Sequence, residues 1–312
     1  MKLYSIFDDY GEEPAKVIRE AGIELDIHPL GQPRPTEEEM GVILKEYEGV
    51  ILGTSQKITE EMFDGIDTPR IIATASVGLD HIHVPEAKKE QVTILNTPKA
   101  NANAVAEYTF AQILSAEKRL TEGNRLYREG KNNKSLHAKP VELAGKLLGV
   151  IGAGEISRRI MQFGSFFGMK ILCWTRTPEN HRDMEELGVR FVSMEELLEA
   201  ADVISVNLPN NRDTQQIISK ERIGKMKDSA IFVSVSRLAL VDTDALLEKA
   251  RTNPGFYACL DVDVDTALSD KVRDMENVSV TPHVAGGTTE TRKRMFMELA
   301  GQIADIVKEG GN

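Results

Sequence analysis

Residues 146–157 read KLLGVIGAGEIS, and this stretch decides how the middle of the chain folds. An apolar run, Leu147–Ile151, leads into Gly152 and Gly154, and an amphipathic stretch begins at Glu155. The first glycine permits a tight turn after a strand, and the second lets a ligand approach the backbone. Because a helix that begins there offers free N–H groups, the pattern predicts a strand–turn–helix unit that binds a pyrophosphate.

Ser157 occupies the third position of this pattern, where Gly or Ala is usual. Serine is small, so the helix can still pack closely on the strand. An ordinary strand-to-helix turn is the alternative interpretation, but the apolar strand before the glycines favours a dinucleotide site. The loop residues expected to bind the cofactor are Gly152, Ala153, Gly154, Glu155 and Ile156.

The next apolar run ends in Thr175, Arg176 and Thr177. A site that prefers NAD normally has Asp or Glu at this point, to bind the ribose hydroxyls. An arginine with two hydroxyl groups would instead bind a 2′-phosphate. We therefore expect NADP to be preferred over NAD, the alternative being a surface arginine without a ligand.

Short apolar runs alternate with amphipathic stretches along the whole chain, as in doubly wound α/β proteins. The first set of expected strands is Lys2–Phe7, Glu24–His28, Gly49–Leu52, Ile71–Thr74 and Thr93–Leu95. The second set is Leu147–Ile151, Lys170–Trp174, Arg190–Val192, Val203–Val206, Ile231–Ser234, Tyr257–Val262 and Ser279–Val280. They lack polar alternation, which is typical of parallel strands covered on both faces.

Two sets of strands predict two α/β domains with parallel sheets. The first should comprise residues 1–100, completed by a C-terminal helix within 286–312, and the second residues 101–285. A single long helix is expected over Asn103–Arg128. The basic residues of 118–139 are interspersed with glutamates and are interpreted as a solvated helix face.

Composition excludes several classes of protein. With a net charge of −11 and 41% hydrophobic residues, the chain can bury a core but offers little to nucleic acid or an anionic membrane. No apolar run is long enough to span a membrane, and the first residues turn acidic too early for a signal peptide. We therefore expect a cytoplasmic protein.

The two cysteines, Cys173 and Cys259, lie in separate apolar runs, which argues against disulfides and metal knuckles. His81 and His83 are too few for a metal site and are expected to be structural. No metal site is predicted.

Three polar residues lie in or just after apolar runs of the second domain: Arg237, Asp261 and His283. Ligands of doubly wound sheets bind at the carboxyl ends of the strands. The three side chains are therefore expected at the edge of the sheet where a ligand binds, the alternative being strand-end residues without a chemical role.

These residues belong to a set of motifs that resembles the D-isomer-specific 2-hydroxyacid dehydrogenase family over nearly the whole chain. The motifs are ASVGLDH at 75–81, NTP at 96–98, AVAE at 104–107, the glycine loop, NLP at 207–209, SR at 236–237, LDV at 260–262 and TPH at 281–283.

The resemblance implies a role for each matching residue. Arg237 would bind the substrate carboxylate and polarise the keto oxygen, and His283 would exchange a proton with that oxygen. The backbone of Ser76, Val77 and Gly78 would also bind the carboxylate. For the cofactor, the implied residues are Val105 and Asp261 at the nicotinamide, with Leu208, Pro209, Val235 and Ala285.

The chain departs from the family at two positions. The family has a Glu about five residues after the Asp of LDV, paired with the catalytic His, but here that position is Thr266. Asp265 is expected to take its place if the loop is rearranged, with Asp263 as second choice. The alternative is that Asp265 is an ordinary loop acid and that no carboxylate reaches His283. Leu238 replaces a Gly that commonly follows the Arg.

The implied activity is the NAD(P)H-dependent reduction of a small 2-keto acid, of the glyoxylate or hydroxypyruvate class, and its reverse. The active site is expected between the two domains, and a homodimer is expected to form through the cofactor domain. The alternative is a dinucleotide-binding, redox-sensing corepressor with little or no turnover.

Overall fold

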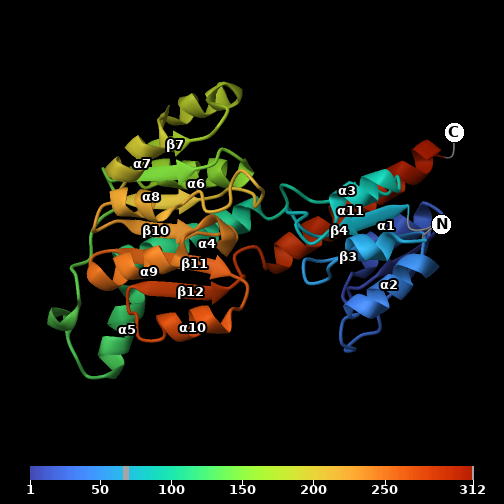
Figure 1. Cartoon of the computed structure of the whole chain (residues 1–312), viewed down its shortest axis with the longest axis horizontal. Helices are drawn as coiled ribbons and strands as arrows, with labels where there is room; N and C mark the ends of the chain where they lie inside the picture. Colours follow the sequence, from blue (N-terminus) through green and yellow to red (C-terminus); the bar gives the residue numbers. More distant parts are fainter. Residues whose placement is uncertain (66–69, 311–312) are drawn as a thin grey trace. The chain divides into compact units, whose positions relative to one another are not determined.

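The computed structural model describes residues 1–65 and 70–310, and the chain divides into two compact units (Figure 1). The first unit comprises Met1–Asn101 and Thr289–Asn312, and the second comprises Ala102–Thr288. We expected these divisions after residues 100 and 285. Of the expected C-terminal segment, residues 311–312 lie outside the described part.

The first unit contains a five-stranded parallel sheet in the order β2-β1-β3-β4-β5, the flavodoxin-like order. Its strands are β1 (Lys2–Ser5), β2 (Glu24–Ile27), β3 (Gly49–Leu52), β4 (Ile71–Thr74) and β5 (Thr93–Leu95). Its helices are α1 (Glu12–Glu20), α2 (Glu37–Glu46), the 3₁₀ turn η1 (Glu60–Phe63), α3 (Val84–Lys89) and α11 (Thr289–Gly310).

The C-terminal helix α11 belongs to the core of this first unit. It packs against α1 and β4, and Phe296, Leu299 and Ile303 are buried with the strand residues. The Tyr10 hydroxyl donates a hydrogen bond to the Phe296 carbonyl at 3.3 Å. Segments from the two ends of the chain therefore share one hydrophobic core.

The second unit contains a seven-stranded parallel sheet in the order β12-β11-β10-β9-β6-β7-β8. This is the dinucleotide-binding order with one further strand at its edge. The strands are β6 (Leu147–Ile151), β7 (Lys170–Trp174), β8 (Val189–Phe191), β9 (Val203–Val206), β10 (Ile231–Ser234), β11 (Tyr257–Val262) and β12 (Val278–Pro282). The two doubly wound parallel sheets confirm the expected fold class.

Helices cover both faces of this sheet and form two cores (Figure 1). Neighbouring residues of a strand point to opposite faces, so Phe232 joins one core while Ile231 and Val233 join the other. The helical elements are α4 (Ala102–Glu117), α5 (Leu120–Arg128), η2 (Asn133–Ser135), α6 (Glu155–Phe166), η3 (Pro178–Leu187), α7 (Met194–Ala200), α8 (Lys220–Lys225), η4 (Leu238–Leu240), α9 (Thr243–Thr252) and α10 (Thr266–Val272).

The expectation of one continuous helix over Asn103–Arg128 is wrong. The chain turns between α4 and α5, where Arg119 adopts the left-handed conformation with φ 56°. The Arg119 side chain is buried, and its guanidinium lies 4.5 Å from the centre of the Tyr257 ring. Glu117 and Glu122 are also buried. The other basic residues of 118–139 lie at the surface, as a solvated face requires, with Lys118, Arg128, Lys131, Lys134 and Lys139 exposed. Burial raises the pKa of Glu117, partly offset by nearby lysines and Arg119.

Cys173 and Cys259 are free and buried in β7 and β11, as expected. Burial raises the pKa of both thiols to about 12, so they stay protonated at neutral pH. Among the described helices, none combines the length and apolar character that a membrane span requires.

Close packing over β6 gives a stability prediction. A Cβ at Gly149 would lie 2.6 Å from Leu197 Cδ2 and 2.9 Å from Ala201 Cβ. We expect Gly149→Ala to lower the free energy of unfolding by about 1–3 kcal/mol through overpacking. Gly224, in α8, has open space at its Cβ position, so Gly224→Ala should be neutral or add up to about 1 kcal/mol. Denaturant unfolding of both variants is the measurement; equal effects would contradict the packing argument.

Candidate active site

The glycine loop between β6 and α6 has the geometry of a phosphate site. Gly152 has φ +106°, and a Cβ there would lie 2.5 Å from the Asn207 carbonyl oxygen, so only glycine fits. A Cβ at Gly154 would meet only open space, so no packing within the protein demands glycine at this position. Its bare backbone leaves room for a ligand beside the start of α6. Ser157 is buried at the third position, as close helix packing requires.

A pocket opens at this loop and contains many of the predicted cofactor residues. Gly152, Ala153 and Gly154 line it together with Thr175, Arg176, Thr177, Leu208 and Pro209. Sequence reasoning assigned no role to the other lining residues, which are Trp174, Asn207, Asp213, Thr214, Ile217 and Arg222. Asn207 lies in the NLP motif and could have been found, whereas Asp213, Thr214, Ile217 and Arg222 follow β9 in segments with no recognisable pattern.

The two arginines that line this pocket each lie beside a carboxylate. Arg176 Nη1 lies 2.7 Å from Asp213 Oδ2, an ion pair between two exposed side chains. Arg222 is the second cation of the pocket, and it donates to the Ile217 carbonyl at 2.7 Å and lies 3.4 Å from Glu195. The predicted phosphate-binding arginine therefore already has a carboxylate partner, which a 2′-phosphate would have to replace.

The structure brings Arg237 and His283 together, although they are far apart in the sequence. Arg237 follows β10 and His283 follows β12, and both strands pair with β11. Parallel strands end at the same edge of the sheet, so the two side chains meet there. Arg237 Nη1 lies 3.4 Å from His283 Nε2.

The expectation that Asp265 pairs with the histidine is wrong. His283 Nδ1 lies 2.7 Å from Asp263 Oδ1, so the second choice makes the contact. The Asp265 carboxylate instead accepts a hydrogen bond from the Leu268 N–H at 3.0 Å and caps α10. Aspartate is favoured at such a helix start because its oxygen satisfies an N–H that has no partner in the helix.

Asp261 holds the turn that carries His283. Its buried carboxylate accepts hydrogen bonds from Thr281 Oγ1 at 2.6 Å and from the N–H groups of Val284 and Ala285, both at 2.8 Å. His283 lies within this turn at φ +52°, a conformation that side-chain-bearing residues adopt only where the surroundings fix it. The contacts shown for Asp261 are thus structural, and its predicted contact with the nicotinamide stays a prediction.

A chain of hydroxyl groups extends from Asp261 to α4. Thr281 donates to the carboxylate, so its oxygen accepts from the Tyr108 hydroxyl, which accepts in turn from Gln112 Nε2 at 2.6 Å. Burial, and the negative charge of Asp261, raise the pKa of Tyr108, while its bonds to Thr281 and Gln112 lower it less. Tyr108 therefore remains a protonated donor. Each hydrogen bond in this series of hydroxyl groups is donated in the direction of Asp261.

Val105, Val235 and Ala285 occupy different parts of the second unit. Val105 is buried in α4, Val235 follows β10, and Ala285 follows His283 in the turn held by Asp261. Glu155 and Ile156 begin α6.

In the first unit, the loop 76–78 has its carbonyl groups engaged. The Thr97 N–H donates to the Ser76 carbonyl, Asn96 Nδ2 to that of Val77, and Ser76 Oγ to that of Gly78. Among the described residues of this unit, no acceptor is hydrogen-bonded to the Val77 or Gly78 N–H. His81 is buried and bonds Thr74, which contacts Ser76, so it has the structural role expected.

Comparison with known proteins decides the family. The model of the "D-isomer specific 2-hydroxyacid dehydrogenase, NAD binding domain" matches residues 110–285. The chain belongs to the D-isomer-specific 2-hydroxyacid dehydrogenase family. It is thus related to oxidoreductases with an NAD-binding domain, and its second unit is that domain.

Relatives of this dehydrogenase share its fold, and those described here are oxidoreductases. A hydroxypyruvate reductase of Thermotoga maritima is 33% identical over 281 residues, which is 88% of this chain and 89% of that protein. The structure of D-lactate dehydrogenase from Aquifex aeolicus, complexed with NAD and lactic acid, has a TM-score of 0.83 at 30% identity and covers 99% and 96% of the two chains. The acyclic imino acid reductase Bsp5, in complex with NADPH and D-Arg, has a TM-score of 0.88 at 25% identity and covers 99% and 98%.

The hydroxyl chain of this dehydrogenase gives a stability prediction. Tyr108→Phe removes the donor to Thr281 and the acceptor of Gln112, and we expect it to lower the free energy of unfolding by about 1–2 kcal/mol. Tyr127→Phe is the matched control because Tyr127 is 85% exposed, and it should change nothing measurable. Chemical denaturation compares the two, and an unchanged Tyr108→Phe protein would show that the chain contributes no stability.

Proposed function

We propose that the protein catalyses the NAD(P)H-dependent reduction of a small 2-keto acid, of the glyoxylate or hydroxypyruvate class, to the D-2-hydroxy acid, and the reverse reaction. The observation that carries the proposal is the apposition of Arg237 and His283 at 3.4 Å. A guanidinium and an imidazole side by side can bind an anionic keto acid and protonate its oxygen. Membership of the family supplies the reaction class.

His283 acts as the acid in reduction. Asp263 accepts the Nδ1 hydrogen of the ring, so Nε2 faces Arg237 and carries the proton given to the keto oxygen. The Asp263 carboxylate also stabilises the charged imidazolium and fixes the ring orientation, a role equivalent to the family Glu. When bound, the nicotinamide cofactor supplies the hydride. In the reverse reaction the same nitrogen removes the proton.

Arg237 binds the substrate carboxylate and polarises the keto oxygen, since its planar group presents several donors at once. In the first unit, we propose the backbone N–H groups of Val77 and Gly78 as further groups that can bind a carboxylate. Support for this comes from the loop itself, whose carbonyl groups are already engaged. The Ser76 N–H donates to the Thr74 carbonyl at 2.8 Å, so within the described part of the chain only the N–H groups of Val77 and Gly78, of the three predicted, remain available to an anion. Asp261 keeps His283 in place and retains a lone pair on Oδ2 for the nicotinamide amide, beside Ala285 and Val105.

Steady-state measurement of NADPH oxidation tests this function, with Asp263→Asn and Asp265→Asn as a matched pair of variants. The protein should oxidise NADPH in the presence of glyoxylate or hydroxypyruvate, and His283→Ala should lower kcat by about a hundredfold or more. Asp263→Asn should lower kcat about ten- to hundredfold, because the imidazolium loses its partner. Asp265→Asn should leave kcat nearly unchanged, because asparagine also caps a helix.

Three outcomes would overturn the proposal. Activity that survives His283→Ala would exclude the histidine as the acid, and a larger loss in Asp265→Asn than in Asp263→Asn would reverse the assignment of the pair. Cofactor binding without turnover of any keto acid would favour the alternative of a redox-sensing corepressor. Adding an amine to the same keto acid panel tests imine reduction, because one structural relative is an imino acid reductase.

We further propose that NADP is preferred over NAD. Arg176, Arg222, Thr175 and Thr177 line the pocket beside the glycine loop and can bind a 2′-phosphate. Asp213 opposes this, since its carboxylate is paired with Arg176 and repels a phosphate. The balance of these groups sets the preference.

Two substitutions of opposite sign test the cofactor preference. Asp213→Asn should raise the ratio of kcat/KM for NADPH over NADH by about three- to tenfold, because Arg176 loses its competing partner. Arg176→Ala should lower the ratio about tenfold or more. Arg182→Ala is the control, because Arg182 is exposed and does not line the pocket. A wild-type ratio that favours NADH tenfold would contradict the preference.

Two further features of the proposal concern where and how the protein works. Both cysteines are free and buried, which suits a reducing, cytoplasmic compartment. We propose a homodimer formed by the second unit, since Leu120, Tyr127 and Phe166 of this unit are exposed apolar side chains. The molar mass in solution tests the assembly.

A further inference from the structure

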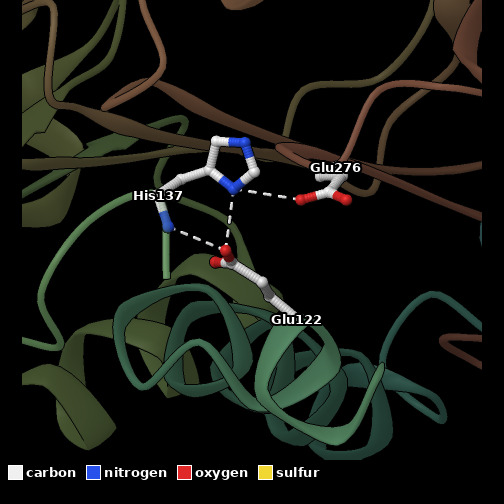
Figure 2. Close-up of side chains that lie close together, drawn as sticks. All are labelled: Glu122, His137 and Glu276. Atoms are coloured by element: carbon white, nitrogen blue, oxygen red, sulfur yellow. Dashed lines mark hydrogen bonds and ion pairs between the residues drawn. The ribbon is translucent and has the colours of Figure 1, made fainter. Parts of the chain in front are cut away.

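Glu122, His137 and Glu276 converge at one point of the second unit, although they come from three separate segments (Figure 2). Glu122 lies on α5, His137 follows η2, and Glu276 lies two residues before β12. His137 Nδ1 is 2.7 Å from Glu122 Oε1 and 3.0 Å from Glu276 Oε2. One potential ligand atom of each residue lies within 4.8 Å of the other two.

Glu122 is the unusual member of this cluster. Its side chain is only 1% exposed, and its Oε1 also accepts a hydrogen bond from the His137 backbone N–H at 2.8 Å. Its Oε2 is buried, and among the described residues nothing donates a hydrogen bond to it. A buried carboxylate oxygen without a partner is costly, so structures rarely keep one without a use. A cation bound by this carboxylate would remove that cost.

We propose that Glu122, His137 and Glu276 form a binding site for a divalent transition-metal ion such as Zn²⁺. The ligands are His137 Nδ1 and a carboxylate oxygen of each glutamate, and Glu122 Oε2 is available as a further donor. One imidazole with two carboxylates suits zinc and its neighbours, whereas Ca²⁺ and Mg²⁺ prefer oxygen ligands alone. This inference is independent of the proposed catalytic function.

The present distances are close to those of a metal site. Ligand atoms about 2.0–2.2 Å from a tetrahedral zinc are about 3.3–3.6 Å apart. The observed distances of 2.7 and 3.0 Å from His137 Nδ1 to the two carboxylate oxygens are hydrogen-bond lengths. The His137 ring would have to move away from the carboxylates by only about half an ångström to reach the separations of a zinc site. The metal replaces the proton on Nδ1, which is released to solvent, so binding weakens as the pH falls.

Arg125 is the group that opposes the metal. Its guanidinium contacts Glu129 at 2.6 Å and Glu276 Oε1 at 2.5 Å, so Glu276 is divided between the arginine and His137. The positive charge beside a metal ligand lowers the affinity for a second cation. Removing this charge should therefore raise the metal affinity, whereas removing a ligand should lower it.

A bound metal would tie three segments of the second unit together. It would fix the segment after η2 to α5 and to the chain that enters β12. Because the ion binds the folded protein through groups that separate on unfolding, it should raise the melting temperature in a concentration-dependent way.

Zinc titration of the full chain, after treatment with a chelator, tests the proposal by calorimetry and thermal unfolding. We expect one Zn²⁺ per chain and a rise in Tm, with Co²⁺ giving the visible absorption of a low-symmetry site. His137→Gln and Glu122→Gln should each weaken binding about tenfold or more. Arg125→Gln should strengthen it about three- to tenfold. His83→Gln is the matched control, because His83 also lies beside a carboxylate, at 3.7 Å from Glu60, outside this cluster.

His137 is exposed, so His137→Gln keeps the test valid if Glu122→Gln does not fold. Absence of saturable 1:1 binding in the micromolar range would overturn the proposal. So would His83→Gln weakening binding as much as His137→Gln, which would indicate adventitious binding to surface histidines. A Glu276→Gln protein that binds zinc as tightly as wild type would show that Glu276 is not a ligand.

Discussion

The carboxylate of Asp261 is the constraint on which the candidate active site depends. It is buried at the end of β11, where an ionised group is unfavourable unless hydrogen bonds replace water. Thr281 and the N–H groups of Val284 and Ala285 supply those bonds, and all three belong to the turn around His283. The same bonds that make the buried charge tolerable hold the histidine at positive φ, which by itself costs about 1–3 kcal/mol. The hydrogen bonds to Asp261 therefore both stabilise the turn and place the imidazole.

The sequence allowed the strands to be placed within one or two residues at most ends, because buried parallel strands are continuous apolar runs. Their order in the sheets could not be derived from such runs, since pairing joins segments far apart in the chain. The apposition of Arg237 and His283 follows from that order. Strands β10, β11 and β12 are neighbours, so the residues that follow them meet at one edge.

Local chemistry explains the positions where the sequence-based predictions failed. Counting from Asp261 pointed toward Asp265, but that residue precedes a helix and its carboxylate satisfies the helix start. The helix expected over 103–128 failed at Arg119, whose guanidinium is buried over the Tyr257 ring. That contact joins residues far apart in the sequence, so no pattern around Arg119 could reveal it. The Glu122 cluster escaped prediction for the same reason, since its three members lie in three distant segments.

The cofactor pocket shows why a motif alone does not set cofactor preference. In the usual NAD-specific arrangement an unpaired acid follows the second strand and repels a 2′-phosphate. Here Arg176 follows the second strand, β7, and the acid, Asp213, lines the pocket from the chain that follows β9. The two charges neutralise each other at 2.7 Å, so the pair repels a phosphate less than a lone carboxylate would. Both side chains are exposed, and an exposed ion pair contributes only about 0–1 kcal/mol. A phosphate with two negative charges can therefore displace Asp213 from Arg176 at small cost, which is the physical basis of the proposed preference for NADP.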